Sequence, residues 1–347
     1  MVTEKKLSLG LQGGGSYAAF GWGVLDRLLE DARFDIAAIS GTSGGAINAA
    51  VLADGFSQGG GREGARRALH RFWQALSSAN MFSPLRRTPF DYLTGTGSVQ
   101  MSPAYHLMQI MGAVLPPQMT PVSMNPLYGL LSSLIDFERV RSCEEIRIYV
   151  PATNVRTGKA NIFVRDELDA RMLAASACLP QLFAAVEIDG EAYWDGSFVG
   201  NPALSPLVGG AHADDILILQ NNPIVRSKLP LSPADIVNRA SEISFNVGFM
   251  FELRAIAHAG ALADEEHPDR RRASRVRLHM ISGNELLSNL DISSKFNLEW
   301  PFILQLHEAG RKAAGDWLAS NASQIGVQST IESHLVDHPE RHAAGGR

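Results

Sequence analysis

A serine flanked by glycines stands near the amino terminus, within the stretch Ile39-Ser40-Gly41-Thr42-Ser43-Gly44-Gly45. The Gly-x-Ser-x-Gly spacing is typical of a nucleophile elbow, a sharp turn that carries the serine hydroxyl at its tip. Such a turn needs residues without side-chain bulk beside the serine, and Gly41 and Gly45 meet this need. We therefore predict that Ser43 is a nucleophile.

The segments on either side of the turn agree with this prediction. Residues 34–39 have the apolar pattern of a buried strand, and residues 46–53 have that of the helix that follows. A strand before the serine and a helix after it form the context that a nucleophile elbow requires.

A glycine run earlier in the chain is the second candidate element. Because a serine hydroxyl is a weak nucleophile at neutral pH, it needs a base and hydrogen-bond donors for the oxyanion that forms. Gly13, Gly14 and Gly15 lie between a strand-like segment, 7–11, and an amphipathic helix. Backbone N–H groups at a helix start can bind negative charge, so we expect an oxyanion hole here; an ordinary tight turn is the alternative. The run has neither a P-loop ending nor the order of a dinucleotide site.

The elements around these motifs predict an α/β fold. Strand, glycine loop, helix, strand, elbow and helix follow one another, which implies a mostly parallel sheet covered on both faces. Further strands are expected at 146–154, 160–164, 185–188, 191–194, 215–220 and 275–281, and further helices at 62–78, 168–177, 233–263 and from Trp300 to about 319. Asp189-Gly190 is a two-residue hairpin turn signal. In helix 233–263, Ile236, Ile243 and Val247 lie on one stripe. We predict one domain over 1–320 and a carboxyl-terminal tail over 321–347.

One long stretch has a different composition. Residues 81–135 hold only three charges, Arg86, Arg87 and Asp91, but six of the ten methionines and seven of the seventeen prolines. Prolines prevent long regular elements, and methionines adapt to irregular apolar surfaces. We expect an insertion that acts as a cap or lid over an acyl-chain site, and an irregular packed cover is the alternative.

The overall composition narrows the class of protein. A formal net charge of −5, with 19% charged and 45% apolar residues, gives no reason to expect nucleic acid as a partner. Two cysteines cannot form a disulfide framework, and no signal peptide or membrane-spanning run is present. No grouping of His, Cys or carboxylates has metal-site spacing, so we expect no metal and no cofactor. We predict a cytoplasmic protein that touches the inner membrane face at most peripherally, and no feature specifies an oligomeric state.

Together the motifs resemble those of the patatin-like phospholipases, lipid acyl hydrolases related to cytosolic phospholipase A2. The resemblance covers about residues 7–220 and rests on Gly13–Gly15, the elbow Gly41–Gly45 and Asp195-Gly196-Ser197. It implies a patatin-like three-layer sandwich and a Ser–Asp dyad without histidine, with Ser43 as nucleophile, Asp195 as base and the glycine loop as oxyanion hole. Gln12 and Ser16-Tyr17 depart from the acidic residue and the Arg-Gly that usually flank the loop.

Two assignments stay open for the base that activates Ser43. An aspartate that acts directly on a serine needs a raised pKa or a very short contact, and therefore a partly buried site. The alternative is a Ser–Asp–His triad in α/β-hydrolase order. Four histidines that follow Asp195 are its candidates, with His212 the best placed: His212, His258, His279 and His307.

The function predicted from these residues is hydrolysis of lipid esters through an acyl-enzyme. Acyl transfer to an alcohol and depolymerisation of an intracellular polyester are alternatives, because the same serine chemistry serves any activated acyl group. A binding or signalling module that keeps the fold without turnover is a third.

Overall fold

The computed structural model describes residues 5–94, 97–114, 126–180, 182–210, 212–226, 229–231, 233–261, 275–331 and residue 335. Within these ranges an eight-stranded sheet has the strand order β5-β6-β3-β2-β1-β7-β8, and β4 pairs with β3 beside this path. The strands are β1 (Lys5–Leu11), β2 (Phe34–Gly41), β3 (Arg147–Asn154), β4 (Ala160–Val164), β5 (Val186–Ile188), β6 (Glu191–Trp194), β7 (Asp215–Gln220) and β8 (Arg277–Ser282).

The central strands run parallel, as predicted. β1 pairs in parallel with β2 on one side and β7 on the other, and the parallel set continues to β3 and β8. β4, β5 and β6 are antiparallel additions at one side. The hairpin turn between β5 and β6 also agrees with the prediction, because Asp189 and Gly190 both have positive φ angles, 52° and 82°.

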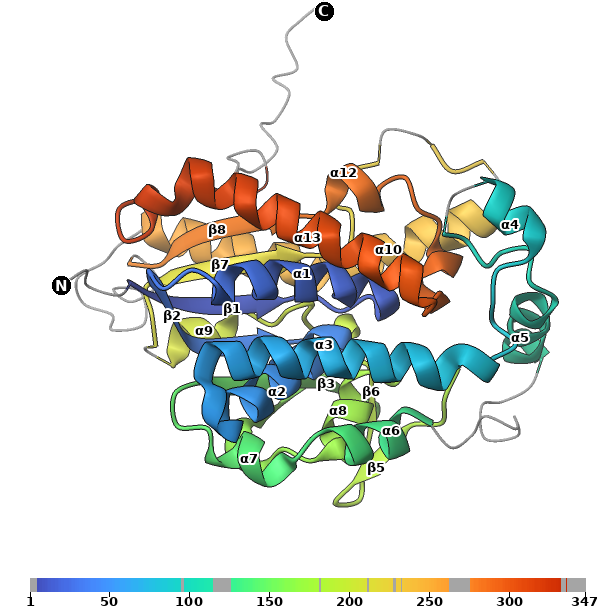
Figure 1. Ribbon diagram of the computed structural model, residues 1–347, viewed down its shortest axis with the longest axis horizontal. Coiled ribbons are helices and arrows are strands. Elements are labelled where there is room, and N and C mark those ends of the chain that lie inside the picture. Colours follow the sequence, from blue (N-terminus) through green and yellow to red (C-terminus); the bar gives the residue numbers. More distant parts are fainter. Residues whose placement is uncertain are drawn as a thin grey trace, which may run out of the picture.

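Helices cover both faces of the sheet (Figure 1). The described helices are α1 (Ala18–Leu29), α2 (Gly44–Gly55), α3 (Gly61–Ala79), α4 (Pro89–Thr94), α5 (Pro103–Val114), α6 (Pro126–Leu134), α7 (Phe137–Ser142), α8 (Ala170–Ser176), α9 (Ser205–Gly209), α10 (Pro233–Ala261), α12 (Asn284–Leu287) and α13 (Trp300–Asn321). The alternation along β7 separates two cores: Leu217 and Leu219 pack with α1, α2 and α13, whereas Ile216 and Ile218 pack with α9 and α10. The three-layer α/β architecture predicted from the sequence is therefore confirmed.

The stripe of apolar residues predicted on helix 233–263 lies on the outward face of α10. Ile236, Ile243 and Val247 are 44–52% exposed, while the buried side of the helix carries Glu242 and Asn246 beside its apolar residues. The physical reason is that the buried side takes part in a polar network at the carboxyl edge of the sheet. An apolar stripe here marks solvent-facing surface rather than core.

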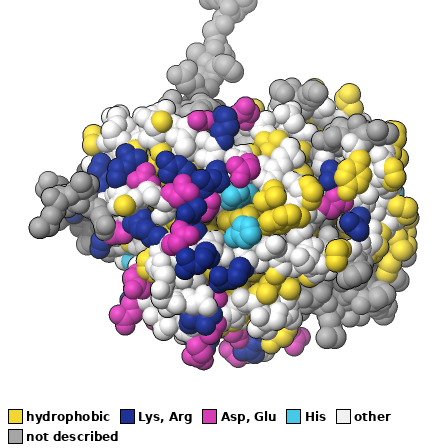
Figure 2. Space-filling model, viewed as in Figure 1, with side chains coloured by type: hydrophobic (Ala, Val, Ile, Leu, Met, Phe, Trp, Pro, Cys, Tyr) yellow, Lys and Arg dark blue, Asp and Glu magenta, His cyan; other side chains and the backbone are white. Residues whose placement is uncertain are grey.

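The charge-poor insertion also exposes apolar side chains. Its described parts contain α4, α5 and α6. The large apolar side chains that are 48–61% exposed there are Met81, Phe90, Tyr92, Met101, Leu107, Ile110 and Tyr128. Figure 2 shows charged side chains gathered toward the left of one face and hydrophobic ones more frequent toward the right, the end where α4 and α5 lie.

The segment after α13 packs on the domain as far as it is described. Ala322 and Ile325 are buried in the main core, and Leu335 is buried in the second core. Residues 336–347, which include the carboxyl-terminal end, lie outside the described ranges. The extent of the domain and the tail stays a prediction.

Two glycines let α1 and α13 lie with their backbones in contact. A Cβ at Gly23 would be 1.9 Å from the His307 carbonyl oxygen, and a Cβ at Gly310 would be 2.1 Å from the Phe20 carbonyl oxygen. Neither neighbour is a flexible side-chain end that could move aside, so any larger residue must push the helices apart.

We predict that Gly310→Ala lowers the free energy of unfolding by about 1–3 kcal/mol, the range typical of overpacking. Gly315→Ala is the matched control, because the same helix leaves open space at that position. Alanine there should raise stability by about 0.5–1 kcal/mol through helix propensity. Urea unfolding of both variants measures the difference, and equal midpoints would contradict the close contact between α1 and α13.

Candidate active site

Ser43 lies at the turn between β2 and α2, at the carboxyl edge of the parallel sheet. Its φ and ψ are 54° and −122°, a conformation that non-glycine residues rarely adopt. A Cβ at Gly41 would be 2.5 Å from the Gly45 carbonyl oxygen, and one at Gly45 would be 2.3 Å from the Leu11 carbonyl oxygen. The turn therefore requires both glycines, as the elbow motif predicts.

The serine is nearly buried between three elements. It is 9% exposed, and its backbone N–H donates to the Ser176 hydroxyl on α8 at 3.0 Å. On the other side the glycine loop approaches, since a Cβ at Gly13 would be 2.6 Å from the Ser43 Cβ. Glycine at position 13 thus permits the loop to contact the elbow.

Asp195 follows β6 and is held from several directions. Its N–H donates to the Cys178 carbonyl at 2.8 Å, and its own carbonyl accepts from the Thr153 hydroxyl at 2.7 Å. The carboxylate accepts the Ser197 N–H at 2.8 Å, and it lies close enough to Ser43 for the serine side chain to lower the Asp195 pKa. The fold thus brings the two residues of the expected dyad together across 152 positions of sequence, from 43 to 195.

Burial determines the protonation behaviour of this carboxyl group. Asp195 is 2% exposed, and burial raises its pKa to about 6, although the hydrogen bonds from Ser197 and Ser43 and the positive charge of Lys295 act in the opposite direction. A carboxylate with such a pKa is ionised at neutral pH and is a stronger proton acceptor than a solvent-exposed aspartate.

The three loop glycines differ in what their backbone can do. The N–H of Gly13 donates to the Asn201 side-chain oxygen at 2.7 Å. Gly14 and Gly15, with φ of 142° and 60°, follow it and lead through a short 3₁₀ turn, Gly15–Tyr17, into α1. No acceptor among the described residues bonds the N–H of Gly14 or Gly15. These two donors are available to a ligand, while Gly13 supplies close approach to Ser43.

Gln12 fills a buried position below the loop. Its amide nitrogen donates to the Asn201 carbonyl at 2.9 Å and to the Asn246 side chain at 3.2 Å. Its oxygen accepts the backbone N–H groups of Asn221 and Asn222 at 2.9 and 2.8 Å. A carboxylate could accept but not donate, so an amide fits this position better than the acidic residue expected from the family resemblance.

Sequence reasoning missed Ser176, Asn201, Asn222 and Lys295. A signal existed for Asn222, which is the second residue after β7, because functional groups gather beyond the carboxyl ends of parallel strands. The other three lie in segments without a motif, and only the fold brings them to the site.

The histidines of the alternative triad have partners elsewhere. Those partners are the Tyr149 hydroxyl for His212 at 2.7 Å, the Arg254 carbonyl for His258 at 2.8 Å, Asp215 for His279 at 3.0 Å and Asp26 for His307 at 3.3 Å. These four contacts do not include Ser43 or Asp195, and the choice between a dyad and a triad stays a prediction.

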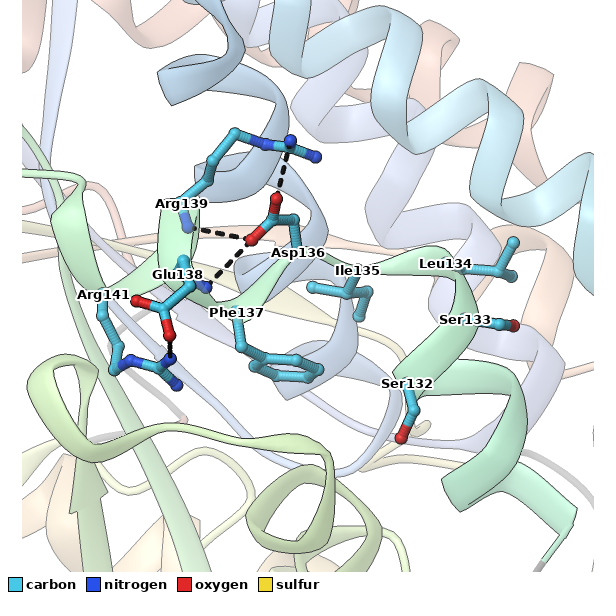
Figure 3. Close-up of a pocket in the computed structure, with 9 residues that line it drawn as sticks. All are labelled: Ser132, Ser133, Leu134, Ile135, Asp136, Phe137, Glu138, Arg139 and Arg141. Atoms are coloured by element: carbon cyan, nitrogen blue, oxygen red, sulfur yellow. Dashed lines mark hydrogen bonds and ion pairs between the residues drawn. The ribbon is translucent and has the colours of Figure 1, made fainter.

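A separate pocket of about 510 Å³ lies at the junction of α6 and α7 (Figure 3). Asp136 caps α7 and pairs with Arg139, and Glu138 pairs with Arg141. Its lining, residues 132–139 and 141, includes none of the residues around Ser43. These charges are satisfied by one another, so the pocket is a surface hollow between two helices. In the described ranges no group of three or more His, Cys, Asp or Glu side chains is placed to hold a metal ion.

Comparison with known proteins gives one family match. The sequence model described as patatin-like phospholipase matches residues 9–208. No curated protein matches the chain in sequence.

Solved structures give distant likenesses. VipD from Legionella pneumophila has a TM-score of 0.37 and 14% identity, over 88% of this chain and 67% of that one. The type III effector protein ExoU has a TM-score of 0.31 and 14% sequence identity, over 90% of this chain and 52% of that one. The heterodimeric ExoU–SpcU complex from the type III secretion system of Pseudomonas aeruginosa gives a TM-score of 0.29 and 16% sequence identity, over 96% of this chain and 73% of that one. At these values the likenesses carry no argument about function.

The geometry predicts how Ser43 reacts with a fluorophosphonate probe. If Asp195 accepts the serine proton, it must be ionised, and the labelling rate should rise with pH through about 6. Ser43→Ala should abolish labelling and Asp195→Asn should slow it by a factor on the order of 10² or more. His212→Ala should leave the rate almost unchanged. A loss of labelling in His212→Ala with the fold intact would replace the dyad by a triad.

Proposed function

Since the chain belongs to the patatin-like phospholipase family and is thereby a lipid ester hydrolase, we propose that it cleaves these esters with a Ser43–Asp195 dyad. The proposal rests above all on one observation: the Asp195 carboxyl group is buried close enough to Ser43 for the serine side chain to lower its pKa, and the glycine loop contacts Ser43 from another side. Nucleophile, base and oxyanion donors are then within reach of one substrate carbonyl.

In the first half of the reaction, the Ser43 oxygen attacks the ester carbonyl carbon while its proton passes to Asp195. The carbonyl oxygen becomes an oxyanion, which the N–H groups of Gly14 and Gly15 and the positive end of α1 stabilise. When the tetrahedral intermediate collapses, the bond to the alcohol breaks and Asp195 returns the proton to the leaving oxygen. The acyl group stays on Ser43 as an ester.

In the second half, water attacks the acyl-enzyme and Asp195 takes its proton. The same oxyanion site stabilises the second tetrahedral intermediate. On collapse the bond between the acyl carbon and the Ser43 oxygen breaks, Asp195 returns its proton to that oxygen, and the fatty acid leaves. An alcohol in the place of water would give acyl transfer by the same steps. The intact dyad and loop argue against a binding module without turnover.

Apolar surface near the dyad supports contact with lipid. Phe198, three positions after Asp195, is 40% exposed, and its ring lies 5.4 Å from that of Phe245 on α10. The outward face of α10 then continues with exposed Ile243, Val247 and Phe251. Exposed apolar patches of this kind mark membrane or partner contacts.

We therefore propose a cytoplasmic enzyme that contacts the inner membrane face peripherally. Among the described helices, none has both the length and the hydropathy needed for a membrane span. Lipid esters would reach Ser43 from the membrane surface, and soluble esters from water.

A turnover screen tests the function and the oxyanion hole together. The enzyme should hydrolyse p-nitrophenyl esters and phospholipid vesicles, and EDTA should not change the rate, because backbone donors rather than calcium polarise the carbonyl. Gly14→Pro removes one donor and should lower kcat by about 10²-fold or more. Loss of activity in EDTA that added calcium restores would overturn the assignment of the glycine loop.

We propose that residues 81–135 form a cap that lines the acyl-chain site, and Met108, Leu115 and Leu127 are the positions that test it. Leu115 lies outside the described residues, Met108 on α5 is half-buried, and Leu127 packs against the main core. If the cap lines the acyl-chain site, Met108→Phe should shorten the preferred acyl chain and spare short esters. Leu127→Phe, which overpacks the core, should lower the melting temperature. An unchanged chain-length profile in Met108→Phe, measured as kcat/KM across an ester series, would refute the lid.

A further inference from the structure

A short 3₁₀ helix, η7 (Ile292–Phe296), is bonded to the glycine loop. The Ser16 hydroxyl donates to the Ser294 carbonyl at 2.8 Å, and the Tyr17 hydroxyl lies 2.7 Å from the Ser294 hydroxyl. A Cβ at Gly15 would be 2.5 Å from the Lys295 carbonyl oxygen. The two residues that follow the glycines therefore hold Lys295 against the loop.

The Lys295 side chain reaches the same loop by a second route. Its ammonium donates to the Asn222 side-chain oxygen at 2.8 Å, and the Asn222 amide donates to the Gly13 carbonyl at 2.8 Å. The ammonium also lies 5.4 Å from the centre of the Tyr17 ring. Asn222 thus bridges the Lys295 ammonium to Gly13, the loop residue that contacts Ser43.

This cation has no carboxylate partner of its own among the described residues. Glu242 on α10 is paired with Arg226 at 2.6 Å and with Arg239 at 3.2 Å. Lys295 instead hydrogen-bonds to a neutral amide. A partly buried charge without a counter-ion destabilises the folded state, and negative charge that is present or develops nearby offsets this cost.

We propose that Lys295 is an electrostatic positioning residue whose ammonium stabilises the negative charge of Asp195 and of the oxyanion beside the glycine loop. The proposal rests on the dyad mechanism proposed above. The charge acts without touching the reacting atoms, through the short distance that Asn222 and Tyr17 maintain between Lys295 and the loop.

The protonation states of the neighbouring groups give this proposal a pH signature. Burial lowers the pKa of Lys295 to about 8, against the raising effect of Glu242 and Asp195, and burial raises that of Asp195 to about 6. Burial also raises the pKa of Cys178, behind Asp195, to about 12 and raises that of Tyr17 further still. The remaining charges that face Lys295 or its neighbours are Glu242, Arg226 and Asp291.

The direction in which kcat/KM changes with pH follows from the protonation state that each residue needs for activity. Asp195 must be ionised, so kcat/KM rises as pH increases through about 6. Lys295 must be protonated, so kcat/KM falls as pH increases through about 8. The wild-type profile should be bell-shaped, and the two limbs belong to the coupled pair.

The experiment measures kcat/KM of a short p-nitrophenyl ester from pH 5 to pH 10 for the wild type, Lys295→Met, Lys295→Arg and Arg239→Met. Lys295→Met should lose on the order of 10-fold at pH 7, less than the loss of a direct oxyanion donor. Its alkaline limb should disappear and its acid limb should move to higher pH. Lys295→Arg should restore activity and keep it at high pH, because arginine stays charged.

Arg239→Met is the matched control, because it removes another cation that pairs with Glu242. The other hydrogen bonds of Arg239 run to the Pro223 and Ile224 carbonyls. Its profile should match the wild type. An alkaline limb near pH 8 that persists in Lys295→Arg would overturn the proposal, and this variant decides the matter if Lys295→Met does not fold. Both limbs unchanged in a folded Lys295→Met would overturn it as well. If the wild type neither turns over esters nor labels at Ser43, the proposed function itself fails.

Discussion

The site depends on a close approach of backbone to backbone around Ser43. A side chain at Gly13, Gly41 or Gly45 would collide with the Ser43 Cβ or with a carbonyl oxygen at 2.3–2.6 Å. These contacts join the carboxyl ends of β1 and β2 to the start of α2 and set the strained conformation of Ser43. If they were lost, Ser43 and the groups that we propose as oxyanion donors and base could not meet at one point.

The second condition is the burial of Asp195, because burial raises the pKa of its carboxyl group. The glycine loop, which contacts Ser43, rests on the amides of Gln12, Asn201 and Asn222, which bond to one another and to the loop backbone. These neutral groups satisfy each other without adding charge. Lys295 donates to the Asn222 amide oxygen beside this network, and we propose that its positive charge acts on Asp195 and the loop.

The local features of the site could be predicted from sequence, and the distant ones could not. The elbow, the glycine loop and the Asp189-Gly190 turn are each defined by a few adjacent residues, whose conformations follow from glycine and turn chemistry. Asn201 lies 188 positions from Gly13, and Ser294 lies 278 from Ser16, so no local pattern connects them. The stripe on α10 shows the same dependence on distant contacts: the buried side of the helix carries Glu242 and Asn246, and Ile236, Ile243 and Val247 face outward.

The most direct test of the account is to detect the acyl-enzyme itself. The enzyme is mixed with excess p-nitrophenyl ester, quenched in acid within the first turnovers, digested and analysed by mass spectrometry. The account predicts that the acyl mass appears on the peptide that contains Ser43, with a matching burst of p-nitrophenol. An acyl group on another residue, or steady turnover by a folded enzyme in which Ser43 is replaced by alanine, would contradict it.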